Sequence, residues 1–461
     1  MNLKKTVAIA AAAGALAAIS VPAMAFENEF HGIFNFKTYL SNFDNAGAGF
    51  FDPNATKSDN RASNYFEQRT RLQYTAKASD DLKLVTQFEL DSTFGGNGAT
   101  GYRGIPGATT AAQGIQSSNN AGNLDADSIT LETKHVYLDF KAGPTTVKIG
   151  IQPYKDAFKG IYLDADISAL ATSTKLGGLT VGAAFSRVNI ANDKSVNKQI
   201  NVIYNEFNRD LFLLDTSYAL SKDIKVGGSY YLDVDYTTPN GETTIHTLGL
   251  NADAKMGPLN VSGFAAMQLG NKKAAGGNNS YHGYALNAAA KLAVGPGTAK
   301  TAILFTSGDD GNDKSINSWQ TPLSTYSESG MMILNRNVAD DGLTTDVALA
   351  HTTNNKDRGQ ILYTLGYDAK IGAKAYANAN AGMLWVAKST NATYNPKKNG
   401  GDLMAAELNL EGGYKLYDNL TAKAQVAYAV LGGYYKDGAK NDATKDPENP
   451  YTVRLGLSYA F

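Results

Sequence analysis

Apolar residues recur at every second position through most of the chain. The pattern is clearest in the last twelve residues, PYTVRLGLSYAF. One register of this stretch holds Tyr451, Val453, Leu455, Leu457, Tyr459 and Phe461, and the other holds Thr452, Arg454, Gly456, Ser458 and Ala460. A period of two predicts a β-strand, and here one face of that strand is apolar from end to end.

The same alternation recurs along the chain between two kinds of connection. Further clear strands are residues 82–91, 224–236, 404–416 and 420–430. Short turns are predicted at residues 79–81, 142–144, 176–178, 221–223, 256–258, 294–297, 371–373 and 417–419. Longer polar connections include residues 41–64, 95–127, 307–357 and 436–449. We count about 18 strands and accept 16 to 20 by this reading of strand and turn signals, because residues 199–204 and 331–351 can be read in two ways.

This organisation predicts an all-β fold, a transmembrane antiparallel β-barrel with short periplasmic turns and long extracellular loops. The last strand is expected to close the barrel against the first, around Phe30, Phe34 and Phe36. Closure removes both edges of the sheet, which lipid would not tolerate.

The first 25 residues are predicted to be a signal peptide. Lys4 and Lys5 precede an apolar stretch, residues 7–20, and Ala23-Met24-Ala25 is a small-x-small cleavage site. A transmembrane anchor is the less favoured alternative, because the apolar run is short. The barrel is therefore expected to occupy residues 26–461.

Composition excludes several classes of function. The 42 basic and 43 acidic residues leave a formal net charge of −1, so no basic stripe points to nucleic acid. No cysteine is present, which excludes disulfides, thiolate metal sites and covalent haem attachment. The 46 Gly, 26 Tyr and 18 Phe suit a barrel whose strands face lipid on one side and water on the other.

With its leader, alternating strands, unequal connections and C-terminal Phe461, the chain resembles the Gram-negative outer-membrane porins over nearly its whole mature length. It is most similar to porins of metal-reducing bacteria. The resemblance implies residence in the cell outer membrane, contact with its lipid and lipopolysaccharide, and assembly as a homotrimer. It also implies that Phe461 belongs to the signal read by the barrel-assembly machinery.

A barrel of this size predicts an open channel. Sixteen to 18 strands leave an aqueous lumen unless a plug fills it, and strands begin soon after the cleavage site. We expect passive diffusion of ions and small hydrophilic solutes. The alternatives are a sheath around a partner in an electron-transfer complex, and a substrate-specific channel for a sugar or organic acid, with Tyr231 and Tyr376 in its path.

The third long connection, residues 153–166, is expected to narrow the channel. Porins similarly fold the loop after the fifth strand into the lumen, with acids on the loop facing bases on the wall. The expected constriction consists of Asp156, Asp164 and Asp166 facing Arg69, Arg71 and Lys148. Further lumen charges are Glu67, Glu89, Asp91, Asp233 and Asp235. Acids lead this list, so a modest preference for cations is expected, although the charges could instead pair with one another.

No other constellation suggests chemistry. The five histidines lack metal-ligand spacing, and residues 308–313 lack the later Glu of an EF-hand. No nucleophile elbow is found. The protein is therefore expected to be no enzyme and to need no cofactor or metal. Tyr74, Tyr236, Trp385 and Tyr459 suit interfacial girdles of aromatic residues.

Overall fold

The computed structural model describes residues 27–43, 62–94, 131–190, 208–237, 241–273, 277–311, 314–335, 348–350, 352–388, 401–438 and 448–461. Its strands are β1 (Glu27–Ser41), β2 (Ser63–Ser79), β3 (Leu82–Thr93), β4 (Leu131–Ala142), β5 (Thr145–Lys155), β6 (Asp164–Leu176), β7 (Leu179–Ile190), β8 (Asn208–Ala219), β9 (Ile224–Asp235), β10 (Glu242–Met256), β11 (Leu259–Lys273), β12 (Asn279–Tyr281), β13 (Tyr284–Val294), β14 (Gly297–Thr306), β15 (Ser315–Ile316), β16 (Gln360–Ile371), β17 (Ala375–Trp385), β18 (Leu403–Tyr417), β19 (Leu420–Leu431) and β20 (Tyr451–Ala460). No helix in these ranges is long and apolar enough to cross a membrane.

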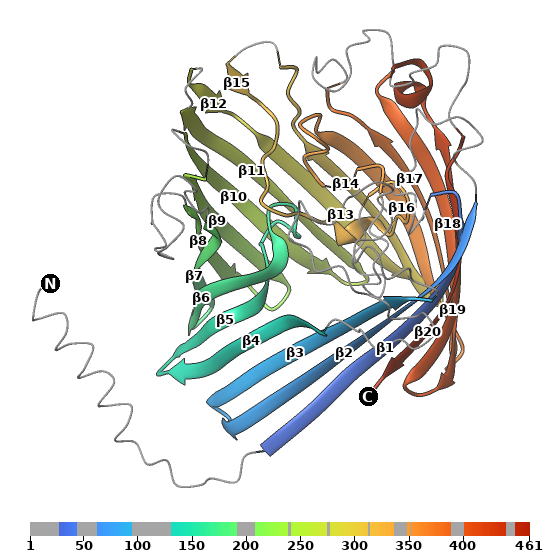
Figure 1. Cartoon of the computed structure of the whole chain (residues 1–461), viewed down its shortest axis with the longest axis horizontal. Helices are drawn as coiled ribbons and strands as arrows, with labels where there is room; N and C mark the ends of the chain where they lie inside the picture. Colours follow the sequence, from blue (N-terminus) through green and yellow to red (C-terminus); the bar gives the residue numbers. More distant parts are fainter. Residues whose placement is uncertain are drawn as a thin grey trace, which may run out of the picture.

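The strands close into one antiparallel barrel (Figure 1). Of the 20 strands found in the described residues, β12 and β15 are only three and two residues long, which leaves 18 long strands in the wall. The seam lies between β1 and β20, where Ile33 is opposite Ala460 and Ser41 is opposite Thr452. The predicted fold class and strand number are confirmed.

The two ends of the barrel differ, as the sequence predicts. All eight predicted short turns join neighbouring strands at one end, which we call the turn end. Glycines in the left-handed region form some of these turns, such as Gly143 at φ 62° and Gly257 at φ 60°. The strand ends that the long connections join lie at the opposite end, which we call the loop end. Residues 199–204 lie outside the described residues, and the described parts of 331–351 form only an isolated bridge between Asn335 and Ala350.

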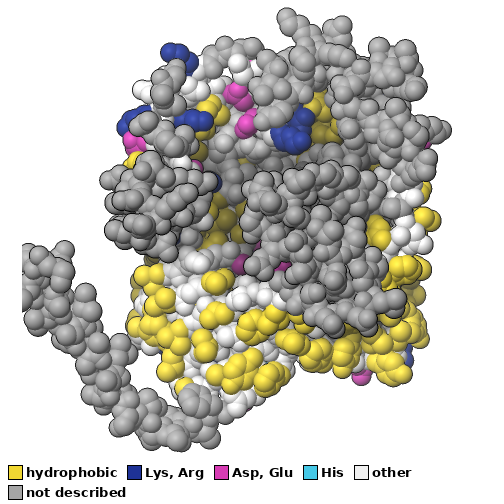
Figure 2. Space-filling view, viewed as in Figure 1, with side chains coloured by type: hydrophobic (Ala, Val, Ile, Leu, Met, Phe, Trp, Pro, Cys, Tyr) yellow, Lys and Arg dark blue, Asp and Glu magenta, His cyan; other side chains and the backbone are white. Residues whose placement is uncertain are grey.

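The wall has an apolar outer face and a polar inner face. Outward side chains such as Leu250 and Leu408 are 70% and 61% exposed, whereas the inward Thr247 and Asn409 are 0% and 1% exposed. Figure 2 shows hydrophobic side chains gathered over the part of the wall nearer the turn end, with most visible charges closer to the loop end. Because side chains alternate along each strand, one sequence supplies both faces.

The terminal aromatic residue completes the seam. Phe461 exchanges backbone hydrogen bonds with Gly32 of β1, at 2.8 and 3.0 Å. A Cβ at Gly32 would lie 2.3 Å from the ring of Phe461, so any larger residue there would require the ring to move. The predicted apolar register of the last strand faces outward, with Leu455 54% exposed.

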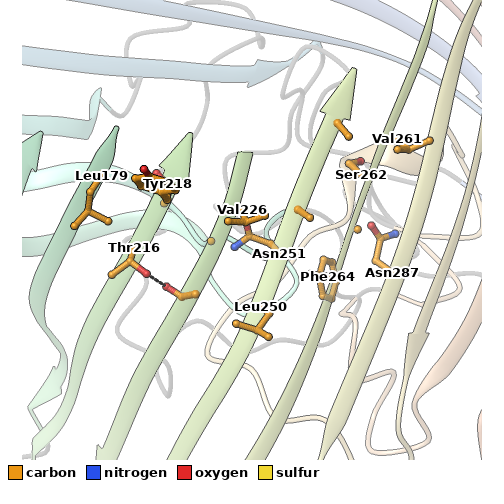
Figure 3. Close-up of a pocket in the computed structure, with 16 residues that line it drawn as sticks. Leu179, Thr216, Tyr218, Val226, Leu250, Asn251, Val261, Ser262, Phe264 and Asn287 are labelled. Carbon is orange, nitrogen blue, oxygen red and sulfur yellow. Dashed lines mark hydrogen bonds between the residues drawn. The ribbon is translucent and has the colours of Figure 1, made fainter. Parts of the chain in front are cut away.

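Glycines make the wall thin between β8 and β11. A hollow of about 780 Å³ there is lined from both registers, by outward residues such as Leu250 and inward residues such as Phe264 (Figure 3). Thr216 donates a hydrogen bond to the carbonyl oxygen of Gly228 at 2.8 Å beside it. No charged residue lines this hollow, so it is not a candidate for a hydrophilic solute path.

Candidate functional site

After β5 the chain turns into the barrel interior, forming the first inner segment (residues 156–163) (Figure 1). The carboxylate of Asp156 holds this turn together by accepting hydrogen bonds from four backbone N–H groups. The donors are Phe158 at 2.6 Å, Gly160 at 3.0 Å, Tyr162 at 2.7 Å and Leu163 at 2.5 Å. Burial raises the pKa of Asp156 to about 6, and the four donors oppose that rise. The carboxyl is therefore mostly ionised at neutral pH.

The first inner segment packs against the wall at β9 to β11. The ring of Phe158 lies 5.4 Å from that of Tyr231 and 5.6 Å from that of Phe264, measured between centroids. Gly249 of β10 makes room for it, because a Cβ there would lie 2.5 Å from the Phe158 ring. Tyr162 stacks on Tyr231 at 5.0 Å. These contacts hold the first inner segment against β9 to β11, across the lumen from β5 and β6, which the segment connects.

A second inner segment (residues 317–335) lies beside the first. The indole nitrogen of Trp319 donates to the carbonyl oxygen of Ile161 at 3.1 Å, and the Thr321 hydroxyl donates to that of Tyr162 at 2.6 Å. The Thr325 hydroxyl donates to the Asp164 carboxylate at 2.6 Å. The two segments are therefore joined by hydrogen bonds between parts of the chain more than 150 residues apart.

The far end of the second inner segment is held by a buried carboxylate of the opposite wall. Glu407 of β18, 3% exposed, accepts hydrogen bonds from three successive backbone N–H groups. The donors are Met332 at 2.8 Å, Ile333 at 3.0 Å and Leu334 at 2.9 Å. Asn409 on the same strand donates to the carbonyl oxygen of Gly330 at 3.0 Å. Successive N–H groups form an anion-binding nest, and here the wall supplies the anion.

A third inner segment (residues 352–359) adds another layer. The Thr353 hydroxyl donates to the carbonyl oxygen of Ile161 at 2.8 Å. The guanidinium of Arg358 donates to the hydroxyl of Tyr434 and, through Nε, to the carbonyl oxygen of Asn355 at 2.9 Å. Three segments that meet in the lumen therefore narrow it together.

The predicted wall bases of β2 do face inward, but they are paired. Arg69 binds Asp91 with two hydrogen bonds of 2.6 and 2.5 Å, and the Nε of Arg71 lies 2.5 Å from Glu89. This is the alternative in which lumen charges satisfy one another. Lys148 of β5 differs, since its ammonium lies 5.5 Å from the ring of Tyr137 and makes no ion pair with any residue that the structure describes.

The three acids expected in the constriction separate into different roles. Asp156 is committed to the backbone of its own segment. Asp164, the first residue of β6, accepts the hydrogen bond from Thr325 of the second inner segment and lies 3.1 Å from the ammonium of Lys155. Asp166 shares the register of the outward-facing Leu170 and pairs with Lys134 at 2.7 Å and His135 at 2.9 Å. The structure therefore does not bring the three acids together opposite Arg69, Arg71 and Lys148.

The remaining predicted lumen charges lie on inward registers. Glu67 and Glu89 are 1% and 3% exposed, and Asp91 pairs with Arg69. The guanidinium of Arg209 lies 2.6 Å from Asp233 and 3.9 Å from Asp235. Tyr231 is fully buried, and its hydroxyl accepts a hydrogen bond from the backbone N–H of Ala157 at 3.1 Å, so it supports the first inner segment rather than a sugar path.

Sequence reasoning missed the second and third inner segments. One signal for them was available, because Met331, Met332, Ile333 and Leu334 form an apolar run inside a long polar connection. Such a run suits a segment that packs inside the barrel better than a solvated loop.

The comparison with solved structures supports this architecture. No family model matches the chain, and no curated protein matches it. Among solved structures it is similar to the outer membrane protein OpdK from Pseudomonas aeruginosa, with a TM-score of 0.52 and 12% identity over 95% of this chain and 100% of that one. A structure of OpdK with vanillate gives a TM-score of 0.53 and 12% identity over the same shares of both chains. OccK2 (OpdF) from the same organism, in complex with glucuronate, gives 0.51 and 13% over 94% of this chain and 98% of that one. At this level of identity the likeness shows the fold.

Proposed function

We propose that the protein is an outer-membrane porin, a water-filled channel through which ions and small hydrophilic solutes diffuse. The observation that carries the proposal is the closed wall of 18 long strands, whose outer face is apolar while its inner face carries charges. Several of these inward charges are solvated, with the side chains of Lys83 and Lys291 42% and 50% exposed. A wet, charged lumen inside an apolar cylinder is the arrangement of a porin.

The proposal includes the surroundings of the barrel. The turn end then faces the periplasm and the loop end faces outward. Outer-membrane lipid and lipopolysaccharide cover the apolar face, the barrel-assembly machinery recognises the last strand with Phe461, and three copies form a homotrimer. The role is transport without catalysis, cofactor or metal. A closer kinship with porins of metal-reducing bacteria stays a prediction from the sequence.

A substrate-specific channel is the second candidate, and the interlocked inner segments favour it. A constriction built from three hydrogen-bonded segments has a defined shape, which suits selection among solutes. The similar structures contain vanillate and glucuronate, each of which carries a carboxylate. The sheath for an electron-transfer partner has less support, because buried residues such as Phe158 and Trp319 occupy the interior that a threaded protein would need.

Liposome swelling tests the function. Vesicles containing the purified protein should swell in small sugars and amino acids, at rates that fall as solute size increases. The E407Q variant, which we expect to free one inner segment, should shift this size limit upward. Vesicles that do not swell in any solute, although the protein is folded and inserted, would rule out the diffusion channel.

A further inference from the structure

A cavity of about 480 Å³ lies at the turn end of the lumen, beside the first and second inner segments. Its walls come from the inner faces of β9, β10, β11 and β13 and from the turn before β9. Five lysines line it, namely Lys159, Lys222, Lys225, Lys255 and Lys291. Three acids face them, namely Asp223, Asp253 and Glu328. The cavity therefore has a formal excess of positive charge.

Strand register brings these groups together. Lys225 of β9 lies directly opposite Asp253 of β10. Lys255, two residues further along the same face of β10, lies opposite Asn260 of β11. Since alternate residues share a face, the ammonium groups from neighbouring strands point into the same space. Ser262 of β11 adds a hydroxyl to the lining.

The three acids of the cavity cannot match its five lysines one for one. Lys159 and Lys291 share a single oxygen of Glu328, at 3.3 and 3.6 Å. Lys225 and Lys255 make no ion pair within 4.0 Å with any residue in the described ranges. These two lysines are available to a ligand.

Several described carboxylates elsewhere in the lumen already have partners. Backbone N–H groups bind Asp156 and Glu407, and arginines bind Asp91 and Asp233. The simple count of acids and bases predicted a modest preference for cations. The cavity itself departs from that count, because its five lysines outnumber its three acids and two of those lysines make no ion pair in the described ranges.

We propose that this cavity is a subsite for small anions with two or more negative charges, carried by carboxylate or phosphate oxygens. The inference rests on the proposed channel, since solutes reach the cavity through the lumen. Ammonium groups on several sides bind a multivalent anion better than chloride, because each negative group finds its own partner. Asn260 and Ser262 supply neutral donors beside the lysines.

Single-channel recording tests the subsite. Pyrophosphate and citrate, added in separate experiments on the turn-end side in KCl, should block the wild-type current. The K225Q/K255Q variant should weaken this block about ten-fold. This is the size expected when the blocking anion loses two partly exposed ion pairs with the protein. Its reversal potential in a KCl gradient should also shift toward cations. Block by pyrophosphate alone, or by citrate alone, identifies which oxygen chemistry the cavity takes.

The matched control is K77Q/K83Q. Lys77 and Lys83 are opposite one another on the inner face of β2 and β3 at the turn end, and each already pairs with an acid, at 3.2 and 3.6 Å. This control removes the same charge at a similar depth and should change the block less than about two-fold.

Equal effects of the two variants would overturn the subsite, because only general charge would then matter. Conductance without block by either anion would also overturn it while the channel itself stands. If the wild type does not conduct, the proposed function fails. Calorimetric binding of pyrophosphate and citrate to the protein in detergent then decides the subsite, which falls if wild type and K225Q/K255Q bind alike.

Discussion

Glu407→Gln should release the second inner segment from the wall. The carboxylate accepts three backbone N–H groups at 2.8 to 3.0 Å and the side-chain amide of Asn409 at 2.7 Å. A glutamine at this position keeps one acceptor oxygen and presents an N–H₂ group toward at least one backbone donor. Hydrogen bonds to a charged group contribute about 1.5–3 kcal/mol each. Losing two of these bonds therefore weakens the attachment of the second inner segment to the wall by roughly 3–6 kcal/mol.

That loss is large for a segment that crosses the lumen instead of belonging to the sheet. Local opening of such segments costs much less than global unfolding. We therefore expect residues 332–334 to leave the wall in E407Q while the barrel stays closed. The open-channel conductance should rise, and the current should become noisier, because a freed segment moves within the lumen. Single-channel recording in planar bilayers measures both effects.

Glu411→Gln is the matched control for this experiment. Glu411 lies on the same inward register of β18, and within the described residues its carboxylate accepts hydrogen bonds from side chains alone, from Asn378 at 3.2 Å and Gln425 at 2.6 Å. E411Q removes the same charge without touching the segment, so its conductance should stay close to that of the wild type. If folded E407Q shows wild-type conductance and noise, or if E411Q changes them equally, the carboxylate does not hold the segment.

Three further substitutions test other parts of the structure. Asp156→Asn should loosen the first inner segment. A single cysteine introduced at the fully buried Ile161 should then react with a small thiol reagent in the Asp156→Asn variant but not in the protein that keeps Asp156. Equal protection of this cysteine in both proteins would contradict the role of the carboxylate. Gly249→Leu should displace Phe158 and destabilise the open state, seen as frequent current fluctuations, and a steady wild-type current would show that the ring has other room. Phe461→Asp should lower the amount of protein at the cell surface more than it lowers the thermal stability of the refolded barrel. If both fall equally, the terminal ring acts only in packing.

The barrel wall could be predicted from the sequence because it depends on a local pattern of residues. Alternation decides which side chains face lipid, and turn residues decide where the chain reverses, so strand number and all eight short turns could be predicted. Counting in twos from Leu170 also places Asp166 on the outward register. The prediction overlooked this because it grouped Asp166 with the other acids of residues 153–166.

The interior could not be predicted in the same way, because its contacts join distant parts of the chain. Nothing near Asp156 indicates that its carboxylate binds its own backbone instead of facing a solute. Glu407 reads as one more lumen charge until its nest, residues 332–334, is placed against it. The availability of Lys225 and Lys255 likewise depends on where every acid finds its partner.

Single-channel recording of the wild-type protein in planar bilayers tests the central claim most directly. The purified, folded protein should insert and produce discrete steps of current in KCl, of uniform size and persisting at low voltage. If barrels shown to be folded and inserted give no current steps across the accessible voltage range, the protein is not an open channel.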